Sequence, residues 1–533
     1  MIKRMHRYVW LAVVSLFLSR LYGQGTELRF LVSPYLQDAE PNSMRIMWET
    51  SFGDESIVEW GETSSLENRT NGSSTDINFD RSRIHEVHLV GLERFTTYFY
   101  RVRTGALVSD IFQFRTPPFA SDRKSFRLVA MSDMQRDERN PNKFREIVRD
   151  GVIPYVRENG GGRLSNDLAL VMVPGDLVVE GPIYLQWQDH FFAPAQPLLS
   201  QVPVYPVPGN HERNADFFFK YFALPANGTP AYAEHWWYKD YGNVRIVGMD
   251  SNKGYGEIPQ QITWLEGLME QTTKDTAIDF VFAQMHHPHK SELWLAGESD
   301  FTGKVVKILE RFTADSGKPS IHFFGHTHGY SRGQSRDHKH LWVNVATAGG
   351  RIDQWGEYAQ ENYDEFTVTQ AEYGFVIAEV DPNGGDPKFT LKRISRGNEG
   401  SPKENLPTDS ITVYRSAKNP LEPKIERPLE GELSYRNVIL QAGPFHGVAP
   451  HAYHAASHWQ VSEVDDFSRT NKDSWKQHDD WYFDKNLQAG DDLRDEHFID
   501  LRPDKKYFWR VRYRDQFLNW STWSEVGSFS TAE

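Results

Sequence analysis

Five short polar motifs, each directly after an apolar run, constrain the fold of this chain more than any other feature. The apolar runs read FRLVAMS, DLALVMV, VPVYPVP, DFVFAQ and IHFFG, and their length and composition are typical of buried strands. In an open α/β sheet, ligands gather beyond the carboxyl ends of the strands, so the residues that follow these runs should converge in one site. In chain order the motifs are Ser132-Asp133-Met134-Gln135, Gly175-Asp176, Gly209-Asn210-His211-Glu212, Met285-His286-His287-Pro288 and Gly325-His326-Thr327-His328.

The motifs supply carboxylate, amide and imidazole groups, which suit a pair of hard-to-borderline metal ions. The 533 residues include no cysteine, so disulfides are excluded and a metal must be held by oxygen and nitrogen donors. The formal net charge is -14 and we find no long run of lysine and arginine. A nucleic-acid-binding surface is therefore not expected.

The N-terminus has the pattern of a targeting signal. Basic side chains among the first seven residues precede an apolar run over residues 8–18, which is too short to span a membrane. This pattern predicts a signal peptide over residues 1–24 and a secreted or periplasmic protein. A signal-anchor is the alternative, disfavoured because Arg20 interrupts the run. No later segment is apolar for long enough to cross a bilayer, so we expect no stable membrane span.

Three folded regions should follow the signal peptide. Residues 26–118 read as short alternating strands separated by turn residues, the pattern of a small β-sandwich. Residues 123–397 alternate strands with helical patterns, which predicts an α/β core with parallel strand pairing. Residues 398–431 are rich in proline, glycine and glutamate and should form a linker or an ordered wrap over the core. Residues 432–533 are strand-like again.

The central region resembles a known family in the order of its motifs and in the sequences between them. The segments that carry the resemblance are WQDHFFAPAQPLLSQVPVYPVPGNHE, WWYKDYGNVRIVGMDS, QQITWLEGL, AQMHHPHK and FFGHTHGYSR. They are similar to the calcineurin-like metallophosphoesterases, most closely the purple acid phosphatase branch. The specific resemblance covers about residues 33–350. It implies a central α/β/β/α metallophosphoesterase sandwich, flanked at both ends by all-β sandwiches of a fibronectin type III-like kind.

The resemblance also implies a centre of two metal ions, divalent or of mixed valence (manganese, zinc or iron), with a bridging hydroxide that attacks phosphorus. Carried over from the family, Asp176 bridges the ions, Asn210 helps to form the catalytic site, and His211 stands outside as general acid to the leaving alkoxide. The first ion takes Asp133 and His328, and the second takes Asn210, His286 and His326. The complete implied ligand set is Asp133, Gln135, Asp176, Asn210, His286, His326 and His328.

Two positions depart from the family pattern. Purple acid phosphatases have a colour-giving tyrosine three residues after the bridging aspartate, where this chain has Val179, which cannot ligate. The common metallophosphoesterase pattern has a histidine two residues after the first aspartate, where this chain has Gln135, a weaker and neutral donor. We therefore expect a colourless enzyme that holds its first metal loosely.

Taken together, the sequence predicts a secreted dinuclear-metal phosphoesterase that hydrolyses a small phosphate ester or a phosphorylated partner. A phosphodiesterase or nucleotidase on the same core is one alternative, because the metal ligands do not fix how many ester arms the phosphate carries. A non-catalytic surface-binding protein with a decayed metal site is another, and Gln135 and Val179 favour it. The C-terminal region could contact a glycan or a cell surface, although its tryptophans are better explained as the core of a sandwich.

Overall fold

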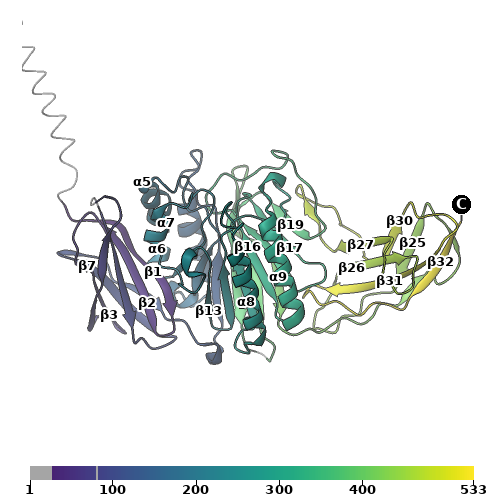
Figure 1. Ribbon diagram of the computed structural model, residues 1–533, viewed down its shortest axis with the longest axis horizontal. Coiled ribbons are helices and arrows are strands. Elements are labelled where there is room, and N and C mark those ends of the chain that lie inside the picture. Colours follow the sequence, from purple (N-terminus) through teal and green to yellow (C-terminus); the bar gives the residue numbers. More distant parts are fainter. Residues whose placement is uncertain (1–26, 80–81, 384, 533) are drawn as a thin grey trace, which may run out of the picture.

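The computed structural model describes residues 27–79, 82–383 and 385–532. The predicted signal peptide, residues 1–24, lies outside the described residues. Figure 1 shows a central body with helices on its surface between two strand-rich units, one at each end of the chain. Within the described residues, no helix is both long and apolar enough to cross a membrane.

The N-terminal unit is a β-sandwich, as the alternating sequence predicts. One sheet has the order β1-β2-β6-β5 and the other has the order β4-β3-β7-β8, with β9 also paired to β7. Buried and partly buried residues alternate along β7, so every second side chain enters the core between the sheets. The strands are β1 (Phe30–Glu40), β2 (Ser43–Thr50), β3 (Ile57–Gly61), β4 (Asn68–Asn71), β5 (Ser73–Asp76), β6 (Arg83–Val90), β7 (Thr97–Thr104), β8 (Leu107–Val108) and β9 (Phe112–Arg115).

The central unit contains two mixed sheets. The six-stranded sheet has the order β12-β11-β10-β20-β21-β22, and β10, β11 and β12 are parallel neighbours within it. Its strands are β10 (Phe126–Ala130), β11 (Leu170–Val173), β12 (Val204–Pro206), β20 (Tyr373–Asp381), β21 (Lys388–Asn398) and β22 (Ser401–Tyr414). The nine-stranded sheet has the order β13-β14-β15-β16-β18-β17-β19-β28-β29. Its strands from the central region are β13 (Trp237–Tyr241), β14 (Val244–Gly248), β15 (Phe280–Gln284), β16 (Ser320–Phe324), β17 (Tyr330–Gln334), β18 (His340–Val345) and β19 (Phe366–Gln370).

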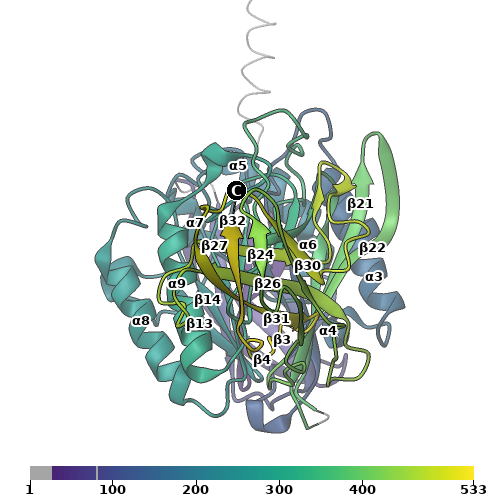
Figure 2. The same ribbon diagram turned by 90° about the vertical axis from the view of Figure 1, so that its right-hand side faces the viewer.

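Helices lie on opposite sides of these two sheets, with α8 and α9 on one side and α3 and α6 on the other (Figure 2). Apolar residues of α8 and α9 join those of β14 and β15 in one buried cluster. The central unit is therefore the α/β/β/α sandwich that the sequence predicts. The helices are α2 (Lys143–Glu146), α3 (Ile153–Glu158), α4 (Leu164–Asp167), α5 (Tyr184–Gln186), α6 (Ala193–Leu199), α7 (Asp216–Tyr221), α8 (Pro259–Lys274) and α9 (Asp300–Ser316).

The C-terminal unit is a second sandwich, with sheets in the orders β23-β25-β30 and β24-β32-β31-β26-β27. Trp459 and Trp509 are fully buried between these sheets, whereas Trp520 and Trp523 are only partly buried, so the core interpretation holds for Trp509 but not for the other two predicted tryptophans. Its strands are β23 (Ile425–Arg427), β24 (Glu432–Ser434), β25 (Val438–Ala442), β26 (His454–Ser462), β27 (Lys472–Gln477), β30 (Asp495–Phe498), β31 (Lys506–Asp515) and β32 (Gly527–Ala532).

Two segments cross the predicted boundaries between regions. Residues 398–431 were expected to be a linker or wrap, but β22 within this range pairs with β21 as the edge strand of the six-stranded sheet. The sequence of β22 is polar and contains prolines, so it does not have the pattern of a buried strand. An edge strand tolerates both features. The hairpin of β28 (Trp481–Tyr482) and β29 (Lys485–Asn486) comes from the C-terminal region but extends the nine-stranded sheet, through a parallel pair between Val368 and Trp481.

Candidate metal centre

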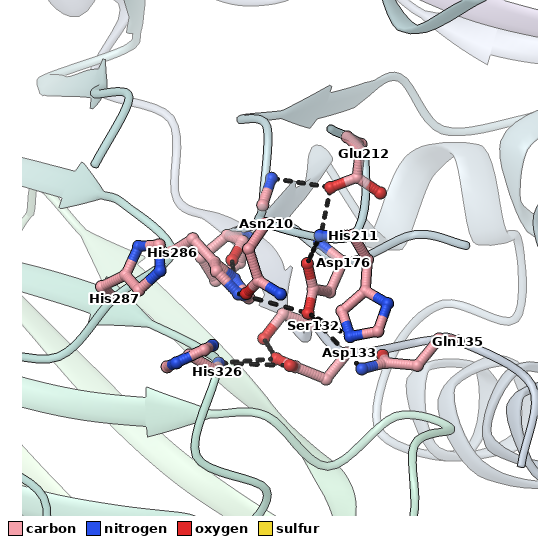
Figure 3. A network of polar contacts seen from close by, with 12 residues as sticks. Ser132, Asp133, Gln135, Asp176, Asn210, His211, Glu212, His286, His287 and His326 are labelled. Atoms are coloured by element: carbon pink, nitrogen blue, oxygen red, sulfur yellow. Dashed lines mark hydrogen bonds and ion pairs between the residues drawn. The ribbon is translucent and has the colours of Figure 1, made fainter. Parts of the chain in front are cut away.

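All five motifs follow strands of the two central sheets, as the sequence predicts. Asp133, Asp176 and Asn210 follow β10, β11 and β12 of the six-stranded sheet, and the histidine motifs follow β15 and β16 of the nine-stranded sheet. The side chains meet where the two sheets come together (Figure 3). In this view Asp176 lies near the middle, with His287 and His326 on one side and His211 and Gln135 on the other.

The backbone turns sharply to bring these side chains together. Asp133, Asp176 and His326 have φ values of 60°, 56° and 71°, in the left-handed region that side chains rarely adopt. A Cβ atom on Gly209 would lie 2.2 Å from Asp176 Oδ1, and one on Gly325 would lie 2.4 Å from Asp133 Oδ2. These motif glycines therefore leave room for the two carboxylates.

Asp176 contacts both sides of the site. Its Oδ1 accepts the backbone N–H of His211 at 3.0 Å, and its Oδ2 lies 3.2 Å from His286 Nε2. Burial raises the pKa of Asp176, but the charge and hydrogen bond of His286 outweigh burial and hold that pKa well below its usual range.

His328 and Asp133 form one half of the site. His328 Nε2 lies 3.2 Å from Asp133 Oδ1, and His328 Nδ1 donates to the Arg351 carbonyl at 2.7 Å. Asp353 holds the same residue by accepting the His328 backbone N–H at 2.7 Å. Burial lowers the pKa of His328, but Asp133 outweighs burial and raises it to about 10.

His286, Asn210 and His326 form the other half. His286 Nδ1 donates to the Pro174 carbonyl at 2.9 Å, which leaves Nε2 facing Asn210 Oδ1 at 2.8 Å. The His326 backbone N–H contacts both Asp133 oxygens at 3.2 Å. Burial lowers the pKa of His286, but Asp176 outweighs burial and raises it to about 9.

His211 lies at the open edge of the site, with its side chain 35% exposed. Its Nδ1 donates to the Val179 carbonyl at 2.6 Å, and its Nε2 lies 3.8 Å from Asp176 Oδ2. The residue at the family's tyrosine position thus contributes its backbone carbonyl to the site. Because Nδ1 is occupied, Nε2 is the ring atom left to exchange a proton with a substrate.

Glu212 supports the turns beneath the site. Its carboxylate accepts backbone N–H groups from Asp176 at 2.9 Å, Leu177 at 2.8 Å and Gly209 at 2.6 Å. Burial, and then the charge of Asp176, raise the pKa of Glu212 to about 7. Glu212 therefore fixes the backbone around Asp176 and Gly209 through these three hydrogen bonds.

Gln135 faces the site with its amide nitrogen, which cannot ligate a metal ion. Its Nε2 lies 3.1 Å from His328 Nε2 and 3.4 Å from Asp176 Oδ2, whereas its buried Oε1 has no hydrogen-bond partner among the described residues. Turning the amide by 180° would exchange the two atoms and present an oxygen lone pair to the site. Because Oε1 has no partner where it lies, the turn would cost it no hydrogen bond.

Neither Asp353 nor His287 is among the site residues predicted from the sequence. The His287 Nδ1 lies 2.9 Å from Ser251 Oγ, and its ring centroid lies 4.5 Å from that of His326. Burial, and then the charge of His286, lower the pKa of His287 to about 3. The adjacent motif histidine was a signal for His287, whereas nothing near Asp353 in the sequence points to His328.

The donor set fits a metal centre. Ligand atoms of Asp133, Asp176 and His286 all lie within 4.8 Å of one another, and so do those of His286, His287 and His326. His286 and His328 lie beside carboxylates that raise their pKa values, so both rings hold an extra proton in the absence of metal. A bound metal ion would replace that proton, because a ligating imidazole must be neutral.

Comparison with known proteins agrees with this geometry. Residues 32–116 match the N-terminal domain of purple acid phosphatases, and residues 126–330 match the calcineurin-like phosphoesterase domain. The central unit is therefore similar to a calcineurin-like phosphoesterase domain over residues 126–330. The preceding sandwich is similar to the N-terminal domain of purple acid phosphatases, the order of domains that the sequence resemblance implies.

Two curated plant proteins illustrate the relationship. A "Probable inactive purple acid phosphatase 1" from Arabidopsis thaliana is 24% identical over 344 residues, which cover 55% of this chain and 53% of the relative. A "Nucleotide pyrophosphatase/phosphodiesterase" from Hordeum vulgare is 25% identical over 244 residues, which cover 42% of this chain and 63% of the relative. The chain spans about half the length of the curated relatives it matches.

Solved structures share the fold. The purple acid phosphatase PPD1 from yellow lupin (Lupinus luteus) matches with a TM-score of 0.57 at 17% identity, covering 72% of this chain and 74% of the lupin chain. The structure of PhoD matches with a TM-score of 0.54 at 11% identity, covering 72% of this chain and 90% of the other.

Proposed function

We propose that this protein is an exported hydrolase of phosphate esters that works with two metal ions. One observation carries the proposal: donor atoms from five strand ends, far apart in the sequence, meet around the buried carboxylate of Asp176. The match of residues 126–330 to the calcineurin-like phosphoesterase domain supports the class of reaction. Export rests on the N-terminal sequence pattern alone.

The ligand roles proposed here follow the two halves of the site. Asp133 and His328, with Gln135 after its amide turns, would hold the first ion, and Asp176 would lie between the two ions. The second ion would be held by Asn210, His286 and His326. When bound, two such ions neutralise the phosphoryl oxygens and make water a strong nucleophile at neutral pH.

The protein's own contribution to the reaction is orientation and a proton. Pro174 and Arg351 fix the rings of His286 and His328 through their carbonyls, so that each ring presents Nε2 to the centre. His211, held by the Val179 carbonyl, would give the proton on Nε2 to the oxygen of the departing alcohol. Water rather than a side chain is the nucleophile, so no covalent phospho-enzyme forms.

The metal centre should be colourless. Valine at position 179 leaves no tyrosine to ligate ferric iron at the place where purple acid phosphatases have one. Visible spectroscopy of the oxidised, iron-loaded protein tests this directly. A strong charge-transfer band would contradict the proposal.

A phosphodiesterase or nucleotidase is a second candidate function, because the barley relative carries the name of a nucleotide pyrophosphatase/phosphodiesterase. Decay of the site is the rival to both, since relatives named probable inactive purple acid phosphatases also match. Protein loaded with Mn²⁺ or Zn²⁺ should release p-nitrophenol from p-nitrophenyl phosphate, from its bis(p-nitrophenyl) diester, or from both. The Asp176→Asn variant should release almost none. Failure to cleave either ester with two ions bound would refute the hydrolase proposal and favour decay.

A further inference from the structure

The C-terminal region approaches the metal centre through the hairpin of β28 and β29. Strand β28 adds to the edge of the nine-stranded sheet beside β19, and β29 folds back on β28. The turn between them contains Phe483 and Asp484. This turn does not enter the metal centre, but it contacts a segment that holds His328.

That segment, residues 351–355, holds His328 by three hydrogen bonds. The Arg351 carbonyl accepts from His328 Nδ1 at 2.7 Å, and Asp353 Oδ2 accepts the His328 backbone N–H at 2.7 Å. The His328 carbonyl in turn accepts the Asp353 backbone N–H at 2.8 Å. The ring orientation and the backbone position of His328 therefore both depend on this segment.

Trp355 joins the segment to the C-terminal hairpin. Its indole Nε1 donates to Asp484 Oδ1 at 3.1 Å, and its ring lies 5.1 Å from Tyr482 and 5.3 Å from Phe483 between centroids. Asn362 adds a second link nearby, because its Nδ2 donates to Asp480 Oδ2 at 3.0 Å. Most residues from 354 to 359 are exposed, so Trp355 is a main anchor of an otherwise open stretch.

We propose that Trp355 and Asp484 are positioning residues for the first metal site, and that the C-terminal sandwich is needed to hold His328 in its ligating geometry. The inference rests on the proposed metal-dependent function. The orientation of the His328 ring matters most for the first metal site, because Gln135 is a weak donor and the Val179 side chain is not a donor. Residues that orient a ligating histidine typically change metal affinity by roughly 10–100-fold when they are replaced.

The test is a calorimetric titration of the metal-free full-length protein with Zn²⁺ or Mn²⁺. Wild type should bind two ions, and Trp355→Ala should weaken one of the two binding steps about tenfold while it leaves the other unchanged. Asp484→Ala should weaken the same step, and Asp484→Asn should restore it, since an amide oxygen can still accept from the indole.

Trp520→Ala provides the matched control. Trp520 also joins the C-terminal sandwich to the central unit, because its Nε1 donates to the Arg336 carbonyl at 2.6 Å, and its ring packs against the Arg512 guanidinium. Its replacement should lower the melting temperature without changing either metal affinity.

The possible outcomes separate this inference from the proposed function. Two ions bound by wild type, with unchanged affinities in Trp355→Ala, would overturn the positioning role and leave the hydrolase proposal standing. Equal weakening of both binding steps in Trp355→Ala, or the same loss of metal affinity in Trp520→Ala, would show a general loss of stability. Either result would also overturn the positioning role. Fewer than two ions bound by wild type would overturn both proposals.

Discussion

At the scale of single residues, Gln135 is the weakest donor of the proposed metal centre. Its ligating oxygen is turned away, and its amide nitrogen lies 3.1 Å from His328 Nε2. Imidazole is a stronger donor than a neutral amide to zinc or manganese. We therefore expect Gln135→His to tighten binding of the first ion about tenfold or more. Competition with a chelator of known affinity measures this change. Unchanged affinity would show that position 135 takes no part in binding.

The His211 side chain allows the leaving-group step to be tested separately from metal binding. His211 lies outside the ligand set and its Nδ1 is held by a backbone carbonyl, so its removal should not release metal. We expect His211→Ala to lower kcat by roughly 10²–10⁴-fold with an unactivated alkyl ester, because the departing alkoxide needs a proton. The metal content should stay at the wild-type value. A variant with full activity on an alkyl phosphate would exclude His211 as the acid.

At the scale of secondary-structure elements, β16 and β18 carry a buried histidine pair beneath the site. His340 Nδ1 lies 2.7 Å from Ser320 Oγ, and its Nε2 lies 3.0 Å from His322 Nδ1. Burial, and then the charge of a neighbouring histidine, lower the pKa of His340 to about 3 and hold that of His322 well below its usual range. Both rings are therefore neutral in the folded protein at mildly acidic pH.

This pair should make the fold sensitive to acid. The unfolded histidines bind protons below about pH 6.5, whereas the folded ones do not, so stability falls as the pH drops below that value. Each ring should cost about 2 kcal/mol at pH 5 relative to pH 7.5. Urea unfolding at these two pH values measures the loss, which His322→Phe should reduce. An equal loss in wild type and variant would contradict this assignment.

The elements that the sequence predicts well are those with a strong local signal. Each buried strand before a motif is an apolar run, and the carboxyl ends of parallel strands bring Asp133, Asp176 and Asn210 together on one sheet. β22 was not predicted as a strand because its edge position permits polar residues and prolines. β28 has only two residues, and its partner β19 lies more than a hundred residues earlier, so no local pattern reveals it.

At the scale of the whole molecule, the three units share contacts that the sequence could not indicate. Tyr35 and Tyr100 of the N-terminal sandwich donate to the carbonyls of Tyr221 and Ser200 in the central unit. At the other end, Arg514 donates to the carbonyls of Ser335 and His338, next to the Trp520 contact. The Trp355–Asp484 contact also depends on how whole domains dock, which is why the support of His328 was missed while His328 itself was predicted.

The central claim is that this molecule assembles one site for two metal ions from both of its central sheets. Elemental analysis of the mature full-length protein, purified without chelator, tests this claim most directly, with His326→Ala as the control. We expect about two metal ions per chain in the wild type and a clear loss in the control. One ion or none, even after incubation with manganese and zinc, would contradict the account and would favour a binding protein with a decayed metal site.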